Sequence, residues 1–255
     1  TAPLKHATKR LGFRAATMPG FSAAMIPALR LDYGEINRRC GLLKELLDRS
    51  AEARLVFSVE PAQRYELVLD LRYREAHASG GVFEAPGVAG NLPSGETYIV
   101  PYEGERAGEP SRSAGVLPVE LDGEVVLYEI EHNRAVRVRS TGSVASAEAA
   151  RLAREPAYGN IAELGLGVLD AFGVEPTGVI LLDEKLGLHI AFGRSDHFGG
   201  QVGPGDFSSP DAVVHIDRVY VPRFQPQVRV VTADLVTAAG EVVPLMRDNE
   251  YAIRF

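Results

Sequence analysis

Cysteine is almost absent from this chain of 255 residues, since Cys40 is the single one. A disulfide within the chain is therefore impossible, and so is a zinc site built from several cysteine thiolates. Any metal ion held by this chain must be bound by histidine, aspartate and glutamate side chains.

Long apolar runs and basic clusters are also lacking. No stretch reaches 18 consecutive apolar residues, and the basic residues among the first ten are not followed by an apolar segment, so neither a membrane span nor a leader is expected. The net charge is -7 and no Lys/Arg-rich run occurs, which argues against a nucleic-acid partner. We therefore expect a cytoplasmic protein that binds neither membranes nor nucleic acid.

The composition, 45% apolar and 24% charged, is that of a globular protein. Asp32-Tyr-Gly-Glu35 fits a capping box, and the residues behind it have helical spacing: Ile36, Cys40, Leu43 and Leu47. Strands are expected at 54–59 and at 65–73, the second with one apolar face: Leu67, Leu69, Leu71 and Tyr73. Further expected elements are a hairpin of 124–130 and 135–139 with its turn at 131–133, a helix at 147–154, strands from 178 onward and a last hairpin through 238–240. These patterns predict an α+β fold with a mixed, strand-rich sheet and a few flanking helices. A metal site on such a fold would lie at strand ends.

The most informative motif is His215-Ile216-Asp217, within an alternating apolar run over 212–221. A β-strand repeats every two residues, so this imidazole and this carboxylate project from the same face of one strand. Burying both beside Val and Ile side chains is costly unless something binds them, and a divalent cation can do so. A hydrogen bond between His215 and Asp217 in a polar cleft is the alternative.

Three further positions combine a metal-binding side chain with a glycine-rich or apolar setting. Glu96 follows a Pro-x-Gly turn that fixes the backbone behind it, Glu163 lies in an apolar stretch with two glycines, and His189 lies in a predicted buried strand over 188–193. A solvated glutamate, an ion pair and a hydrogen-bonded core histidine are the respective alternatives. Two histidines and three carboxylates suit zinc, cobalt, manganese or iron(II).

Four sequence blocks in a fixed order resemble the thermophilic-type metallo-aminopeptidases, the family of aminopeptidases T and S. The blocks are NLPSGE (91–96), NIAELGLG (160–167), LLDEKLGLHIAFG (181–193) and HID (215–217). The segment Ala16-Thr-Met-Pro-Gly20 is also similar, and the resemblance runs from about residue 12 to near the C-terminus. It implies one catalytic domain over 1–255, without the N-terminal α/β domain that family members carry.

The resemblance also implies a site and a reaction. Glu96, Glu163, His189, His215 and Asp217 would be the metal ligands. They would hold two divalent ions, expected to be zinc, cobalt or manganese, that bind the free amino terminus of a peptide and activate a water. Removal of N-terminal residues from peptides and a homodimeric assembly follow from the same resemblance.

One departure from the family pattern concerns catalysis. The family has a tyrosine seven residues after the motif histidine, and here Asp196 occupies that position, next to His197. Asp196 or His197 could replace the tyrosine. We expect Glu96 and His197 to be the catalytic residues. Tyr220 projects from the opposite strand face and is a poor substitute. We also expect Glu184 to donate or accept a hydrogen bond at the ring of His189.

Two alternative functions stay open. The similar 2,5-dihydroxypyridine 5,6-dioxygenases imply a single iron(II) and a small aromatic diol as substrate, and the missing tyrosine favours this alternative. A metal-binding protein without catalytic activity is the other possibility. The presence of all five ligands argues against it.

Overall fold

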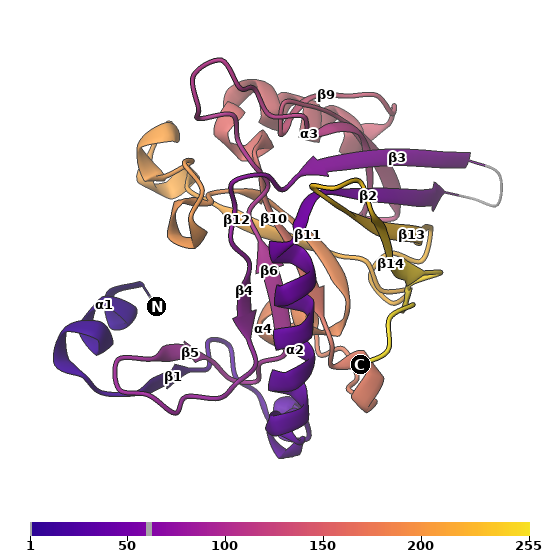
Figure 1. Ribbon diagram of the computed structural model, residues 1–255. Coiled ribbons are helices and arrows are strands. Elements are labelled where there is room, and N and C mark those ends of the chain that lie inside the picture. The colour runs from indigo at the N-terminus through magenta and orange to yellow at the C-terminus, as the bar shows by residue number, and fades with distance from the viewer. Residues whose placement is uncertain (1, 60–62) are drawn as a thin grey trace.

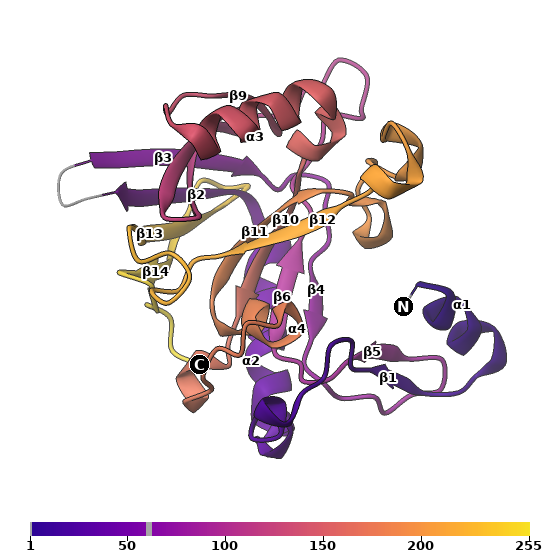
Figure 2. The same cartoon turned by 180° about the vertical axis from the view of Figure 1, so that it is seen from behind.

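The computed structural model of the protein describes residues 2–59 and 63–255, and their strands form three sheets (Figures 1 and 2). The eight-stranded sheet has the order β15 (Glu250–Tyr251), β14 (Val242–Arg247), β13 (Val228–Thr237), β2 (Ser50–Val59), β3 (Gln63–Asp70), β7 (Ala114–Leu121), β8 (Glu124–Glu131) and β9 (Arg134–Val138). The five-stranded sheet has the order β12 (His215–Val219), β11 (Leu188–Gly193), β10 (Ile161–Gly167), β6 (Glu96–Ile99) and β4 (His77–Ser79). A two-stranded ribbon pairs β1 (Ala15–Thr17) with β5 (Ala89–Asn91).

The fold is α+β, as the sequence predicts. Pairing within the two large sheets is antiparallel, and the parallel pairing is that of the ribbon. The α-helices are α1 (Ala2–Leu11), α2 (Tyr33–Asp48), α3 (Ser143–Arg154) and α4 (Ile180–Asp183). Side chains of both large sheets and of α2 share one hydrophobic core. None of the helices in 2–59 and 63–255 is long and apolar enough to cross a membrane.

Helix α2 begins where the sequence predicts. The Asp32 carboxylate accepts hydrogen bonds from the backbone N–H groups of Gly34 and Glu35, at 2.9 and 3.2 Å. Such a cap satisfies donors that have no partner inside the helix. The four predicted apolar residues of α2 are all buried, and this face packs against β4 and β6, the strands that lead into the candidate site.

The predicted buried face of β3 is correct except at its end. Leu67, Leu69 and Leu71 are buried, but Tyr73 is 46% exposed and has a φ of 64°. The chain leaves the sheet because the buried Asp70 carboxylate accepts hydrogen bonds from the backbone and the guanidinium of Arg72. The prediction that Tyr73 continues the apolar face is therefore wrong.

The other predicted elements are present, with shifted ends. The β8–β9 turn contains His132 and Asn133 at positive φ, which is typical of a tight hairpin turn. Helix α3 begins at Ser143, earlier than predicted, and β13 and β14 form the last long hairpin. Strand β12 covers only the middle of the predicted run over 212–221.

Candidate metal centre

Neighbouring strands of the five-stranded sheet bring predicted metal ligands onto one face. Glu163 on β10 lies opposite Ala191 on β11, and Ala191 lies opposite Asp217 on β12. His189 and His215 lie two residues from Ala191 and Asp217, so they belong to the same face. Ala191, with its small side chain, therefore lies between these two carboxylates in the register of the sheet.

Glu96 joins this face from the far side of β10. It is the first residue of β6 and pairs with Gly167, the last residue of β10. Gly165 also belongs to β10 and lies opposite His189 on β11. The His189 ring occupies the space above this glycine. The sheet thus gathers all five predicted ligands from four strands that are far apart in the sequence.

Glu163 is at the centre of the cluster. Its Oε1 lies 3.1 Å from His189 Nε2, and its Oε2 lies 3.3 Å from His215 Nε2. His189 Nε2 is also 3.6 Å from Glu96 Oε2, and His215 Nε2 is 3.4 Å from Asp217 Oδ1. Two overlapping groups could each hold a metal ion, and both contain Glu163: Glu96, Glu163 and His189 in one, Glu163, His215 and Asp217 in the other.

Backbone carbonyls orient both imidazoles. The Gly187 carbonyl accepts from His189 Nδ1 at 3.2 Å, and the Arg194 carbonyl accepts from His215 Nδ1 at 2.8 Å. Each Nε2 is thereby directed at the carboxylates, an arrangement typical of metal-binding histidines. The prediction of a hydrogen bond between Glu184 and the His189 ring is wrong, because Nδ1 binds the Gly187 carbonyl and Nε2 binds Glu163.

Interactions among the side chains of the cluster shift their pKa values against the effect of burial. Burial acts to lower the pKa of His189, but the hydrogen bond and the charge of Glu163 raise it to about 9. The pKa of His215 is likewise raised well above its usual value, against the effect of burial, by Asp217 and Glu163. Burial acts to raise the pKa of Glu163, and the two imidazoles hold it well below its usual range. Protons therefore occupy positions that a divalent cation could take.

The donor set fits divalent metal ions. Imidazole nitrogens and carboxylate oxygens are the ligands that zinc, manganese and iron(II) accept. Glu96 Oε2 is buried and has no hydrogen-bond partner in the described part of the chain, although it points at the cluster. An unpaired buried carboxylate oxygen is costly, and a metal ion at this point would satisfy it.

A buried lysine, which the sequence did not reveal, completes the site. Lys185 is fully buried, and its Nζ donates to Glu96 Oε1 at 2.5 Å and to Glu184. Burial raises the pKa of Glu184 to about 8, with Lys185 opposing this effect and Glu96 adding to it. A block that reads as a charged surface segment therefore carries an internal ion pair.

A cavity of about 260 Å³ opens over the cluster. Its lining residues include four of the five predicted ligands and the following others: Ala78, Ser79, Ala89, Gly90, Asn91, Tyr98, Glu184, His197 and Phe198. Predicted catalytic residue His197 thus lies on the cavity wall. Burial, then His215 and Arg194, lower its pKa to about 4. Asp196 instead forms an ion pair with Arg194, 2.5 Å between Oδ1 and Nε.

Two tyrosines differ in their relation to this cavity. Tyr98, two residues after Glu96, contributes to the wall and packs against Phe198 with ring centroids 4.7 Å apart. The alternation of β6 puts Tyr98 on the Glu96 face, a signal that was available in the sequence. Tyr220 lies in the core and donates to the Pro118 carbonyl at 2.8 Å, away from the cluster as expected.

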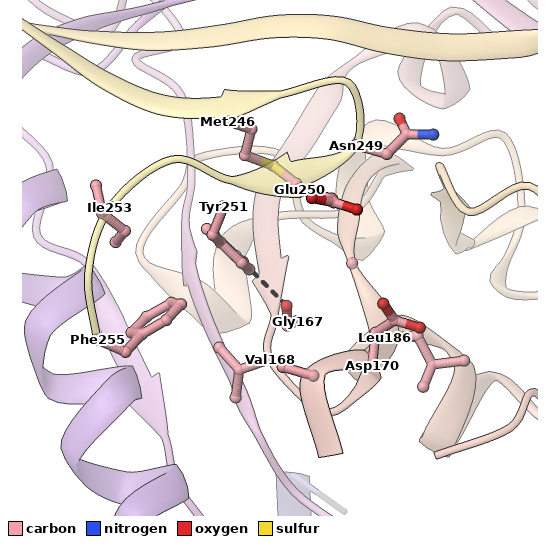
Figure 3. A pocket seen from close by; sticks show the side chains of 12 residues that line it. Gly167, Val168, Asp170, Leu186, Met246, Asn249, Glu250, Tyr251, Ile253 and Phe255 are labelled. Atoms are coloured by element: carbon pink, nitrogen blue, oxygen red, sulfur yellow. Dashed lines mark hydrogen bonds between the residues drawn. The ribbon is translucent and has the colours of Figure 1, made fainter. Parts of the chain in front are cut away.

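Another cavity, of about 340 Å³, lies beside the C-terminal residues (Figure 3). Apolar side chains such as Val168, Leu186 and Ile253 contribute to its lining, and Tyr251 donates to the Gly167 carbonyl at 2.9 Å. Asp170 and Glu250 are its carboxylates, and no imidazole is among the residues that line it. It therefore lacks the mixed donor set of the cluster on the five-stranded sheet.

Comparison with known proteins shows similarity of fold. No family model matches the sequence, and no curated protein matches it. The solved structure of AmpT, an aminopeptidase T from Thermus thermophilus, is similar with a TM-score of 0.57 and 21% identity over 87% of this chain. The structure of 2,5-dihydroxypyridine dioxygenase from Pseudomonas putida KT2440 is similar with a TM-score of 0.66 and 14% identity over 99% of this chain.

This chain covers 55% of the AmpT chain and 69% of the dioxygenase chain. Both similar proteins are enzymes, and this chain shares their fold while presenting side chains that could hold a metal ion.

Proposed function

We propose that this protein is a metal-dependent hydrolase of the aminopeptidase type, with two divalent ions at the cluster. The position of Glu163 carries the proposal. Its two oxygens lie next to two different imidazoles. Each imidazole belongs to one of the two groups of possible metal ligands that share Glu163. A carboxylate with this placement can bridge two ions a few ångströms apart.

The charges around the cavity also fit the binding of divalent cations. Four carboxylates gather there, and Lys185 is the buried cation that accompanies them: Glu96, Glu163, Glu184 and Asp217. Buried charges are stable only when they are balanced. With neutral imidazoles these carboxylates outnumber Lys185, and divalent cations would supply the missing positive charge.

Each residue would have a distinct task in hydrolysis. Glu96 and His189 would hold one ion, His215 and Asp217 the other, with Glu163 between them. Such a pair supplies Lewis acidity toward the scissile carbonyl and lowers the pKa of a bound water. Lys185 holds Glu96 Oε1, so that Oε2 is left to face the cluster. His197 lies on the cavity wall, where a ring nitrogen could accept a proton from the attacking water and give it to the departing amine.

One observation favours the dioxygenase alternative. Two imidazoles flank one carboxylate, since His189 and His215 both lie next to Glu163. Two histidines and one carboxylate are the ligands of many iron(II) oxygenases. A single iron at this position would make the protein an oxygenase for a small aromatic diol.

Metal analysis distinguishes these functions. Protein purified without chelator and under anaerobic conditions should contain about two equivalents of zinc, cobalt or manganese, as expected for a two-ion site. Glu163→Gln should lose both ions, and His215→Ala should lose one. Glu155→Gln is the matched control, because that carboxylate is also buried but binds Ser208 in another part of the molecule. One equivalent of iron would overturn the hydrolase proposal in favour of oxygenation.

Activity assays complete the test. The loaded protein should hydrolyse aminoacyl p-nitroanilides and should not consume oxygen with 2,5-dihydroxypyridine. Metal binding without either reaction would make it a non-catalytic metal-binding protein. We also propose that it forms a homodimer, which light scattering of the purified protein would test.

A further inference from the structure

The ribbon presents the edge of a strand to the metal-site cavity. β5 pairs with β1 along one side in the two-stranded parallel sheet. Residues 89–91, the whole of β5, line the cavity together with Glu96 and Asp217. Figures 1 and 2 show β5 as the strand of the ribbon nearer to β4, with β1 on the far side.

The register determines which main-chain groups of β5 are used by β1. The Ala15 N–H donates to the Val88 carbonyl at 3.1 Å, and the Leu92 N–H donates to the Thr17 carbonyl at 3.0 Å. In a parallel pair, alternate residues of a strand bond to the same neighbour. Position 90, between these two bonds, therefore also faces β1.

The main-chain groups of Ala89 and Asn91 point to the opposite edge. Their N–H and C=O groups have no hydrogen-bond partner within residues 2–59 and 63–255. An unpaired strand edge is a template for another extended chain. β4, the last strand of the five-stranded sheet, contributes Ala78 and Ser79 to the lining of the same cavity.

We propose that the free edge of β5 binds the main chain of an extended peptide, whose amino terminus lies at the metal ligands. This inference rests on the proposed aminopeptidase function and defines its substrate class as peptides of several residues. Main-chain hydrogen bonds give affinity with little dependence on sequence, as in other cases of strand addition. A small aromatic diol could not use the donors and acceptors of Ala89 and Asn91 in this way.

Substrate length provides the first test. The value of kcat/KM for alanine-based tetrapeptides with an N-terminal leucine should exceed that for leucine p-nitroanilide. A tetrapeptide N-methylated at the amide that pairs with β5 should lose about tenfold, as expected for one or two lost hydrogen bonds. Equal kcat/KM for all three compounds would overturn the inference.

Ala89→Pro is the decisive variant, and Ala16→Pro is its matched control. Proline lacks an N–H and is tolerated at a strand edge where that group faces away from the neighbouring strand. Ala89 faces the cavity edge of the ribbon, whereas Ala16, between the two β1 residues that bond to β5, faces the other edge. Ala89→Pro should reduce the ratio of tetrapeptide to anilide kcat/KM about tenfold. Ala16→Pro should keep the wild-type ratio.

Binding separates this inference from the hydrolase proposal. A tetrapeptide whose first amide is replaced by a methylene-amine is not hydrolysed, and calorimetry measures its affinity. Weaker binding by Ala89→Pro, with wild-type melting temperature and metal content, would support peptide binding at the edge of β5 even if the protein hydrolyses no peptide. If Ala89→Pro hydrolyses the anilide and binds the tetrapeptide as the wild type does, peptide binding at the edge of β5 is overturned. The hydrolase proposal is then left intact.

Discussion

The imidazole of His189 lies against the backbone of Gly165, so that a Cβ on this glycine would come within 1.9 Å of Nε2. The two residues are register partners on β10 and β11. The ring therefore lies over the neighbouring strand, where it contacts Glu163, and only glycine leaves it room. The local sequence Glu163-Leu-Gly-Leu-Gly thus combines a predicted ligand, Glu163, with the space that the His189 ring occupies.

Gly165→Ala should displace the His189 ring and weaken metal binding. A shift of one ligand away from its neighbours should lower metal affinity at least tenfold, about the loss seen when the groups that orient a ligand are removed. Titration of the metal-free protein with zinc measures the effect.

Gly41→Ala is the control for this substitution. A Cβ at Gly41, inside α2, would meet no atom within 4 Å, and alanine favours a helix by about 0.5 to 1 kcal/mol over glycine. This variant should bind zinc as the wild type does and unfold at a higher denaturant concentration. Wild-type zinc affinity in Gly165→Ala would contradict the assignment of His189 as a ligand.

Lys185→Met should destabilise the metal-free protein strongly. It leaves the carboxylates of Glu96 and Glu184 buried without their cation, and breaking a buried ion pair costs about 3 to 5 kcal/mol. Metal ions would replace part of the lost positive charge. The difference in unfolding free energy between variant and wild type should therefore be smaller with zinc than with chelator. An equal difference under both conditions would show that Lys185 and the metal ions do not share these carboxylates.

His197→Ala should slow hydrolysis about a hundredfold without loss of metal, as expected when a group that transfers protons is removed. His197 lines the cavity, 5.3 Å from His215 between ring centroids, and it is outside both groups of predicted ligands. His132→Ala is the control, because that ring binds the Ser111 carbonyl. Loss of metal in His197→Ala would make His197 a ligand instead.

Asp70 should make stability depend on pH in the acid range. Burial acts to raise its pKa, but hydrogen bonds from Arg72 and from the Arg112 N–H hold this pKa below the usual 3.8. A carboxyl with a lowered folded-state pKa stabilises the protein above the unfolded-state pKa, and the effect is lost as pH falls through the folded-state value.

Asp70→Asn should therefore lower the unfolding free energy at pH 7 by about 1 to 3 kcal/mol, the usual cost of losing hydrogen bonds to a buried charged group. The difference from wild type should shrink as pH falls below 3.8. Urea unfolding between pH 3 and pH 7 measures it. A difference that does not change over this range would show that Asp70 does not contribute through its charge.

Much of the site could be predicted from short stretches of sequence. The spacing of His215 and Asp217 places both on one face, and the apolar run around His189 predicts a buried strand; the structure has both. The two glycines after Glu163 are visible in the sequence, but only the structure shows that the His189 ring packs against Gly165. The same alternation wrongly predicted that Tyr73 continues the apolar face of its strand, because the hydrogen bonds of Asp70 end the strand before Tyr73.

By itself, the sequence determined the α+β class, the capped helix α2 and the side-chain types of the cluster. These follow from periodicity and chemistry within a few residues. The tertiary structure decided that Glu163 lies between two imidazoles, that Lys185 is buried against the Glu96 carboxylate and that the edge of β5 faces the cavity. Each of these relationships joins strands or turns that are distant in the chain, and their distances are fixed by strand order and register, which local spacing does not encode.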